Sequence, residues 1–190
     1  MPISPQDALI IVDMQNDFLP GGALGIAGAD RLIPTLNTLL DQPFGASIAT
    51  QDWHPAGHCS FTPQGGPWPT HCVQGTQGAE LAALLRTDTL CAILRKGMAQ
   101  AVDSYSAFTD NNGQNPTGLA GLLRERGIKR VIVCGLALDV CVADTALAAQ
   151  KLGFESVVLA DASASAQEDP TQVGNRLRAG GVSVLTITAL

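Results

Sequence analysis

The 190-residue sequence has few basic and few aromatic residues. Lysine and arginine together number 11 against 17 aspartate and glutamate residues, which leaves a formal net charge of -6. Proteins that bind nucleic acid without regard to sequence need a positive surface, so the composition disfavours this class. No basic run points to an anionic membrane surface either. Aromatic residues make up only 4% of the chain, whereas alanine, leucine, valine and glycine are abundant, as in tightly packed helix–sheet proteins.

Long hydrophobic runs and a paired set of cysteines are also missing. No stretch approaches the roughly 18 apolar residues that a membrane helix needs. The N-terminal segment has no basic region, and its apolar run 8–12 is too short for a signal peptide. Five cysteines, an odd number, cannot form a closed set of disulfides. We therefore expect a cytoplasmic protein with free thiols and a single domain over residues 1–190.

Short apolar runs alternate with longer helical patterns along the chain. Helical patterns at several positions begin near a proline or end at a glycine, which is the expected helix punctuation. This alternation predicts an α/β protein with a doubly wound, mainly parallel six-stranded sheet and helices on both faces. The predicted strands are 8–12, 46–50, 90–94, 130–134, 156–159 and 182–187, and the predicted helices are 30–40, 117–126, 140–152 and 170–179.

Polar residues follow several of the predicted strands directly. In a doubly wound sheet, the ligand site lies beyond the C-terminal ends of the strands. Asp13, Asp52 and Lys96 each come soon after an apolar run, as does the segment 135–141. The sequence therefore predicts that these residues approach one another at one edge of the sheet.

The segment 51–78 breaks the alternation and contains all three histidines. A long irregular segment in a compact domain is usually functional or mobile. Asp52 and His54 project to the same side of an extended segment, and His71 folding back would complete a set of metal ligands. Aspartate and histidine suit zinc, iron or manganese, so we predict a metal-binding loop. The alternative is that these histidines lie in ordinary surface turns.

Two cysteines in the same loop offer a second ligand set. Cys59 and Cys72 could act as thiolate ligands in a closed structural metal site. This alternative is weaker, because each cysteine is adjacent to a histidine and would compete with it for one ion.

Cys141 stands between a predicted strand and a predicted helix. A cysteine at a helix N-terminus lies at the positive end of the helix dipole, which favours the thiolate, and free N–H groups there can bind an oxyanion. The alternative is a small buried cysteine, a description that fits Cys134 better. A thiol nucleophile needs a base. Asp13 could accept the proton while Lys96 holds both anions, although an ordinary ion pair is the alternative.

Five motifs follow one another in a fixed order. They are DMQNDF at 13–18, DWHP with HCSF between 52 and 61, WPTHCVQG at 68–75, KG at 96–97 and GLALDVCV at 135–142. Together they resemble the isochorismatase-like cysteine hydrolases and, within them, the nicotinamidases or pyrazinamidases, over about residues 7 to 188. The DWHP and WPTHCV elements are the specific ones, because related branches share the Asp/Lys/Cys triad but generally lack this metal loop.

The resemblance implies a reaction and the groups that perform it. The expected activity is hydrolysis of nicotinamide, and of pyrazinamide, to the acid and ammonia through a thioester, in NAD salvage. One divalent ion is implied, with zinc ahead of iron and manganese. The implied catalytic triad is Asp13, Lys96 and Cys141. The implied metal ligands are Asp52, His54 and His71.

The resemblance also implies how the substrate is held. The amides of Ala137 and Cys141 would bind the oxyanion, with a cis peptide bond between Leu136 and Ala137. His58 matches a further ligand or a supporting group, and Ser60 would lie near the metal through water. The positions implied to clamp the pyridine ring are Phe18, Leu24, Trp68, Tyr105 and Ala137.

Two residues depart from the family pattern near the nucleophile. Leu138 replaces the usual threonine, and Val140 replaces an aromatic residue or histidine found in many members. A related hydrolase acting on another small amide or an N-carbamoyl compound is therefore the second expectation, and a metal-binding scaffold with an inert thiol is the non-enzymatic alternative. We expect a small-molecule substrate, no nucleic-acid or membrane partner, and a monomer or homo-oligomer.

Overall fold

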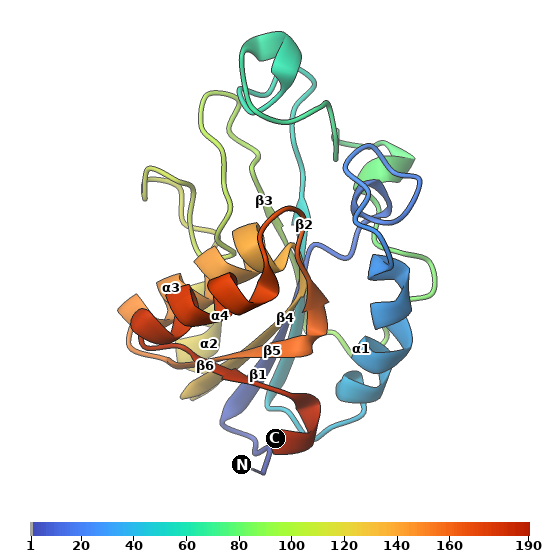
Figure 1. Ribbon diagram of the computed structural model, residues 1–190. Coiled ribbons are helices and arrows are strands. Elements are labelled where there is room, and N and C mark those ends of the chain that lie inside the picture. Colours follow the sequence, from blue (N-terminus) through green and yellow to red (C-terminus); the bar gives the residue numbers. More distant parts are fainter. Residues whose placement is uncertain (1) are drawn as a thin grey trace.

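Six parallel strands form one sheet in the part of the chain that the structure, a computed structural model, describes, residues 2–190 (Figure 1). Their order is β3-β2-β1-β4-β5-β6, and every neighbouring pair is parallel. The predicted doubly wound α/β fold is therefore confirmed. The strands are β1 (Asp7–Val12), β2 (Ala46–Asp52), β3 (Ala92–Lys96), β4 (Arg130–Leu136), β5 (Glu155–Ala164) and β6 (Ser183–Leu185).

The central strands are apolar on both faces because helices cover both sides of the sheet. Every residue of β1 and of β4 is buried. Alternate residues of β1 enter different cores: Ile10 packs on the side of the C-terminal helices, and Ile11 packs on the opposite side. The continuous apolar runs in the sequence thus reflect two hydrophobic cores separated by one sheet.

The four α-helices of the described residues divide unequally between the two faces (Figure 1). One face carries α1 (Ile33–Leu40), and the other carries α2 (Leu119–Glu125), α3 (Ala143–Lys151) and α4 (Pro170–Ala179). The Asp169 carboxylate caps α4 by accepting the Thr171 N–H at 2.8 Å, and Pro170 occupies the first turn, where no N–H is needed. Within residues 2–190, no helix combines the length and apolar character needed to cross a bilayer.

The element boundaries differ from the predicted ones where the sheet edge or a turn intervenes. The third strand is Ala92–Lys96 rather than 90–94, because an edge strand is only partly buried and its apolar residues do not mark its ends. The predicted helix 140–152 is divided into a π-helical turn at Leu138–Val142 followed by α3. The predicted strand 182–187 is reduced to the three residues of β6.

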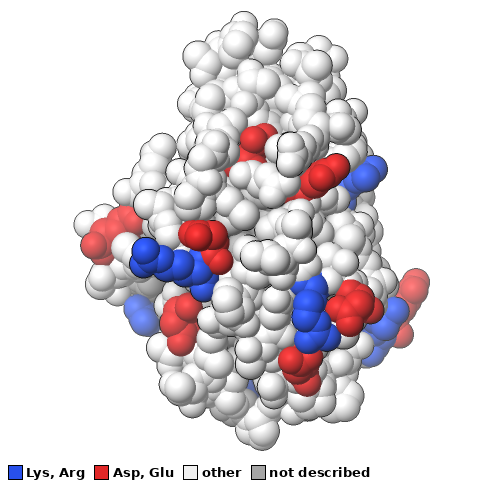
Figure 2. All heavy atoms as spheres, turned by 90° about the vertical axis from the view of Figure 1, so that its right-hand side faces the viewer, with Lys and Arg blue, Asp and Glu red and all other residues white. Residues whose placement is uncertain are grey.

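The strand order reverses between β1 and β4, and the chain connecting β2 to β3 rises above this point (Figure 1). Such a reversal opens a crevice at the C-terminal strand ends. The segment 53–79 contains no aspartate, glutamate, lysine or arginine. Figure 2 accordingly shows an uncharged upper part, with the charged side chains gathered over the body of the molecule. The sheet thus provides the floor of the site and this uncharged segment covers it.

Asp7 and Arg130 form a buried ion pair between β1 and β4. Arg130 donates to the Asp7 carboxylate from Nε at 2.8 Å and from Nη2 at 2.7 Å, and the Ser4 N–H donates at 2.7 Å. Burial raises the pKa of Asp7, but these hydrogen bonds outweigh it and hold the pKa below its ordinary value. The pair therefore stabilises the fold while Asp7 is ionised.

Asp7→Asn is expected to lower the free energy of unfolding at pH 7 by about 3 kcal/mol, because the buried Arg130 guanidinium loses the Asp7 carboxylate. The folded-state pKa lies below the unfolded value of roughly 3.9, so this stabilisation is present above about pH 4 and is lost as the pH falls through the folded-state pKa. Urea unfolding measures this effect: the difference in the free energy of unfolding between wild type and variant should be smaller at acidic pH than at pH 7. Asp88→Asn, at the exposed pair with Arg86, is the control and should change little. A difference in the free energy of unfolding that does not change with pH would contradict the role given to the Asp7–Arg130 ion pair.

Candidate active site

The buried ammonium of Lys96 is surrounded by groups from the ends of three other strands. The Lys96 Nζ atom at the end of β3 lies 2.9 Å from Asp13 Oδ2 and 3.4 Å from Cys141 Sγ. It also lies 2.6 Å from Asp52 Oδ1, at the end of β2, and 2.9 Å from the Ser104 carbonyl oxygen. Asp13 follows β1, and Cys141 lies in the turn after β4. The structure thus brings together the sulfur, carboxylate and ammonium that the sequence placed after separate strands.

The two carboxylates around Lys96 have opposite pKa shifts. Burial lowers the pKa of Lys96, but the charges of Asp13 and Asp52 outweigh it and raise this pKa well above its ordinary value. Burial raises the pKa of Asp13, and the nearby Asp52 charge adds to this although Lys96 opposes it. Burial also acts to raise the pKa of Asp52, but Lys96 and His54 outweigh it and hold that pKa below its usual range. Asp13 is therefore suited to accept a proton, while Asp52 stays ionised.

The surroundings of Cys141 favour the thiol over the thiolate. Burial raises its pKa well above the ordinary value, and the Lys96 charge only partly opposes this. Burial inside this π-helical turn therefore opposes the thiolate that a position at a helix N-terminus favours. One Asp13 oxygen accepts the Thr50 hydroxyl at 2.7 Å, whereas the other has no hydrogen bond of good geometry and faces Lys96. That oxygen is available for the thiol proton.

Asp52, His54 and His71 form a cluster whose ligand atoms all lie within 4.8 Å of one another. The His54 Nδ1 atom lies 2.9 Å from the Gly97 carbonyl, and the His71 Nδ1 atom lies 2.7 Å from the Pro69 carbonyl. A carbonyl only accepts, so each Nδ1 carries a proton and Nε2 is the ring atom that each histidine offers to a metal ion. One carboxylate and two oriented imidazoles fit a divalent cation. The cluster is therefore a possible metal-binding site.

His58 and Ser60 support this cluster from outside. The His58 ring stacks on His54 with centroids 4.1 Å apart. Its Nε2 atom lies 3.2 Å from the Val102 carbonyl, and its Nδ1 atom lies 2.7 Å from the Ser60 hydroxyl. Both His58 nitrogens are thus engaged, with Nε2–H donating and Nδ1 accepting. His58 thus supports His54, and Ser60 is turned toward His58. His54, His58 and Asp103 also form a second group whose ligand atoms lie within 4.8 Å of one another.

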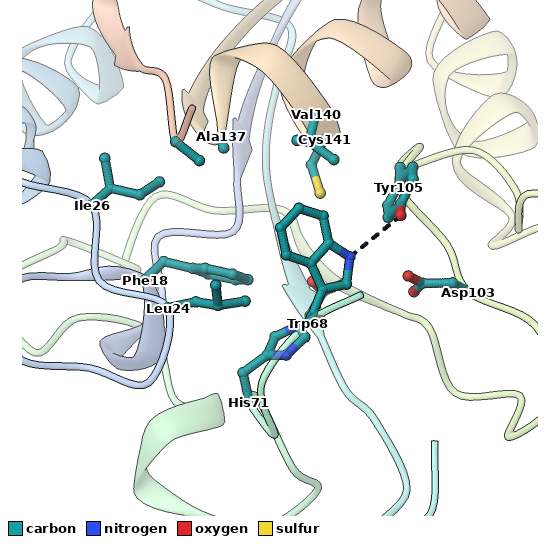
Figure 3. Close-up of a pocket in the computed structure, with 12 residues that line it drawn as sticks. Phe18, Leu24, Ile26, Trp68, His71, Asp103, Tyr105, Ala137, Val140 and Cys141 are labelled. Atoms are coloured by element: carbon teal, nitrogen blue, oxygen red, sulfur yellow. Dashed lines mark hydrogen bonds between the residues drawn. The ribbon is translucent and has the colours of Figure 1, made fainter. Parts of the chain in front are cut away.

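A pocket opens above the sulfur and reaches the histidine cluster (Figure 3). It encloses about 460 Å³ between its walls, part of it open to solvent. Trp68 Nε1 donates to the Tyr105 hydroxyl at 3.3 Å and so fixes two walls. The structure places all the predicted ring-clamping residues in the lining: Phe18, Leu24, Trp68, Tyr105 and Ala137. It adds residues that no motif identified: Ile26, Asp103 and Ala166.

The backbone before the sulfur has the geometry that the resemblance implied. The peptide bond between Leu136 and Ala137 is cis. Gly135 has φ +110°, and a Cβ there would lie 2.3 Å from the Val12 carbonyl oxygen. Only glycine therefore lets β4 approach β1 at the point where the turn carrying Cys141 begins.

Asp139 ties this turn to the loop that follows β5. Its carboxylate accepts the N–H groups of Ala166 at 2.8 Å, Gln167 at 2.8 Å and Glu168 at 2.9 Å. These bonds outweigh burial and hold the pKa of Asp139 below its ordinary value. Since Ala166 lines the pocket, the ionised Asp139 fixes one wall relative to Cys141. Sequence reasoning missed this residue, because its partners lie far along the chain.

Gly97→Ala is expected to weaken metal binding by about 10- to 100-fold, the usual effect of disturbing a group that orients a ligand. A Cβ at Gly97 would lie 2.4 Å from His54 Cε1 and 2.6 Å from His54 Nδ1. Zinc titration with a competing chelator measures the effect. Gly113→Ala is the matched control, because Gly113 also has positive φ but nothing lies within 4 Å of its added Cβ. Equal zinc affinities in the two variants would refute the role assigned to Gly97.

Comparisons with known proteins cover almost the entire chain. The model of the isochorismatase domain matches residues 7–189. A nicotinamidase from Acinetobacter baylyi is 48% identical over 171 residues, covering 82% of this chain and 79% of that protein. The crystal structure of PnC1 from L. infantum in complex with nicotinate superposes with a TM-score of 0.96 at 48% identity, covering 100% of this chain and 98% of that one. The pyrazinamidase of Pyrococcus horikoshii in complex with zinc gives a TM-score of 0.84 at 40% identity, covering 96% and 100%. The chain belongs to the isochorismatase family.

Proposed function

We propose that this protein is a nicotinamidase, which hydrolyses nicotinamide to nicotinic acid and ammonia through a thioester and serves NAD salvage. The observation that carries the proposal is the contact of the Lys96 ammonium with Asp13 and Cys141 beneath a ring-lined pocket. Relatives named nicotinamidase and a neighbour in complex with nicotinate support the substrate. Pyrazinamide, another small ring carboxamide, is proposed as a second substrate, in line with the pyrazinamidase neighbour.

The first half of the reaction forms the thioester. Asp13 accepts the Cys141 proton, and Lys96 stabilises the resulting charges. The thiolate attacks the carboxamide carbon, and the amides of Ala137 and Cys141 receive the oxyanion. Loss of one such donor typically costs about 3–4 kcal/mol in the transition state. Protonated Asp13 then donates to the departing nitrogen, so the C–N bond breaks and ammonia leaves.

The second half releases the acid. Asp13, again ionised, accepts a proton from a water molecule that attacks the thioester carbon. The bond to sulfur breaks, the carboxylic acid forms, and Asp13 returns its proton to the Cys141 sulfur, which restores the thiol and the ionised base. Thr50 donates a hydrogen bond to the other Asp13 oxygen and so keeps the base oriented through both steps.

We propose that the histidine cluster holds the pyridine ring in place. Asp52, His54 and His71 would hold one divalent ion, zinc in this proposal, whose chemistry there is Lewis-acid binding of the ring nitrogen. Iron and manganese suit the same ligand set. Phe18 and Trp68 would enclose the two faces of the ring. The amide carbon is thereby presented to Cys141.

Val140 is the residue that supports a second candidate substrate class. It lines the pocket, so its replacement of an aromatic residue or histidine alters the wall next to Cys141. Leu138, by contrast, is packed in the hydrophobic core and does not line the pocket. The alternative function is hydrolysis of another small amide or an N-carbamoyl compound by the same thiol. In either case we propose one catalytic domain over residues 1–190, acting on small molecules in the cytoplasm as a monomer or homo-oligomer.

The purified protein is expected to release ammonia and nicotinic acid from nicotinamide in equal amounts. Chelation should abolish the activity, and zinc, iron or manganese added back should restore it, because the ring loses its anchor without the ion. Ammonia release measured in parallel with pyrazinamide and an N-carbamoyl amino acid defines the substrate class. Turnover of the carbamoyl compound but not of nicotinamide would replace the proposal by its alternative.

Cys141→Ala is expected to lower turnover by about 10⁴-fold or more, since the nucleophile is lost. The metal content, measured by elemental analysis, should remain that of the wild type. His54→Ala is expected to lower the metal content, and turnover should fall as a consequence of the lost metal. Cys134→Ala is the matched control, because Cys134 is a buried thiol in β4 outside the pocket. Substantial turnover in Cys141→Ala would end the covalent mechanism.

A further inference from the structure

Asp103 is a carboxylate in the pocket wall that the proposed mechanism leaves unused. It lies in the loop after β3, and Figure 3 shows its carboxylate pointing into the pocket beside Trp68 and Tyr105. Within residues 2–190, no lysine, arginine or histidine nitrogen lies within 4.0 Å of it. Its carboxylate lies within 4.8 Å of ring nitrogens of His54 and His58, so an acidic side chain faces both the substrate space and the histidine cluster.

The Asp103 side chain contributes little to holding its own loop. Its Oδ1 atom accepts only the N–H of the adjacent Ser104, at 2.8 Å. The loop is fastened by other bonds: the Asn111 N–H donates to the Asp103 backbone carbonyl at 2.8 Å, and the Tyr105 N–H donates to Asn111 Oδ1 at 3.0 Å. The Asp103 carboxylate can therefore act on a molecule in the pocket as well as on the neighbouring histidines.

The Asp103 carboxylate changes the net charge of the pocket and its surroundings. With Asp13, Asp52 and Asp103 ionised and Lys96 protonated, the site carries two net negative charges. A divalent ion held by Asp52 and two neutral imidazoles brings the total to zero. Without Asp103, the same loaded site would carry one positive charge. Asp103 thus decides whether the pocket is neutral or attracts anions.

Neutrality matters because the reaction changes the charge of its ligand. The carboxamide substrate is neutral, whereas the carboxylic acid product ionises, and a positive pocket in a low-dielectric cleft would retain this anion. We propose that Asp103 is a specificity-determining residue that favours the neutral carboxamide over the carboxylate product and so promotes product release. This inference rests on the proposed function.

Asp103→Asn tests the charge alone, because asparagine keeps the shape and an oxygen acceptor for the Ser104 N–H. The variant is made in zinc-loaded Cys141→Ala protein, which binds without turnover, and calorimetry gives the dissociation constants of nicotinamide and nicotinate. From the Coulomb interaction at protein-like dielectric, nicotinate should bind on the order of tenfold more tightly while nicotinamide changes by less than about twofold. Asp144→Asn is the matched control: Asp144 borders a neighbouring groove with Tyr105 but not the substrate pocket, so the ratio should move much less.

Asp103→Glu keeps the charge and should retain the parental preference. An unchanged ratio of the two constants in Asp103→Asn would overturn the inference. Loss of bound zinc in that variant would also overturn it, because Asp103 would then act on the metal rather than on the ligand. Failure of the native protein to release ammonia from nicotinamide would refute the proposed function itself. Normal turnover with an unchanged binding ratio would refute only the role of Asp103.

Discussion

One buried ammonium group constrains the whole site. The Lys96 side chain is 1% exposed, and removing a charge from water costs several kcal/mol unless close partners compensate. Asp13, Asp52 and the Ser104 carbonyl provide that compensation. The ends of β1, β2 and β3 must therefore meet at one edge of the sheet, which the parallel strand order allows. Cys141 joins them from β4, across the point where that order reverses.

Asp52 joins two chemistries that are usually described separately. Its Oδ1 atom contacts Lys96 at 2.6 Å, and its Oδ2 atom lies 3.6 Å from His54 Nε2. The candidate metal ligands and the thiol therefore share one electrostatic network, in which Lys96 keeps Asp52 ionised for a cation. Gly97 extends the link, because its carbonyl orients His54 directly after Lys96 in the chain. A change among the candidate metal ligands therefore alters the electrostatics around Lys96 and Cys141 through these short contacts, and the reverse also holds.

The pocket combines apolar walls with charges placed at its ends. Phe18 and Trp68 can hold a flat ring without regard to charge, so they do not distinguish an amide from an acid. That distinction requires a fixed charge, which Asp103 supplies from a loop outside the sheet. Val140 alters the wall nearest the sulfur, whereas Leu138 is enclosed in the core. Of these two departures from the family pattern, Val140 is the one in contact with the pocket.

The sequence by itself determined the α/β alternation, the residues that follow the strands and the grouping of Asp52, His54 and His71. These are local properties, since apolar periodicity and motif spacing depend on neighbours along the chain. Only the tertiary structure decided that Cys141 is a buried thiol, that His58 supports His54, and that Asp103 faces the pocket. Burial, protonation and the direction of a side chain depend on groups contributed by distant segments. No local pattern contains that information, because the energies involved arise when those segments pack together.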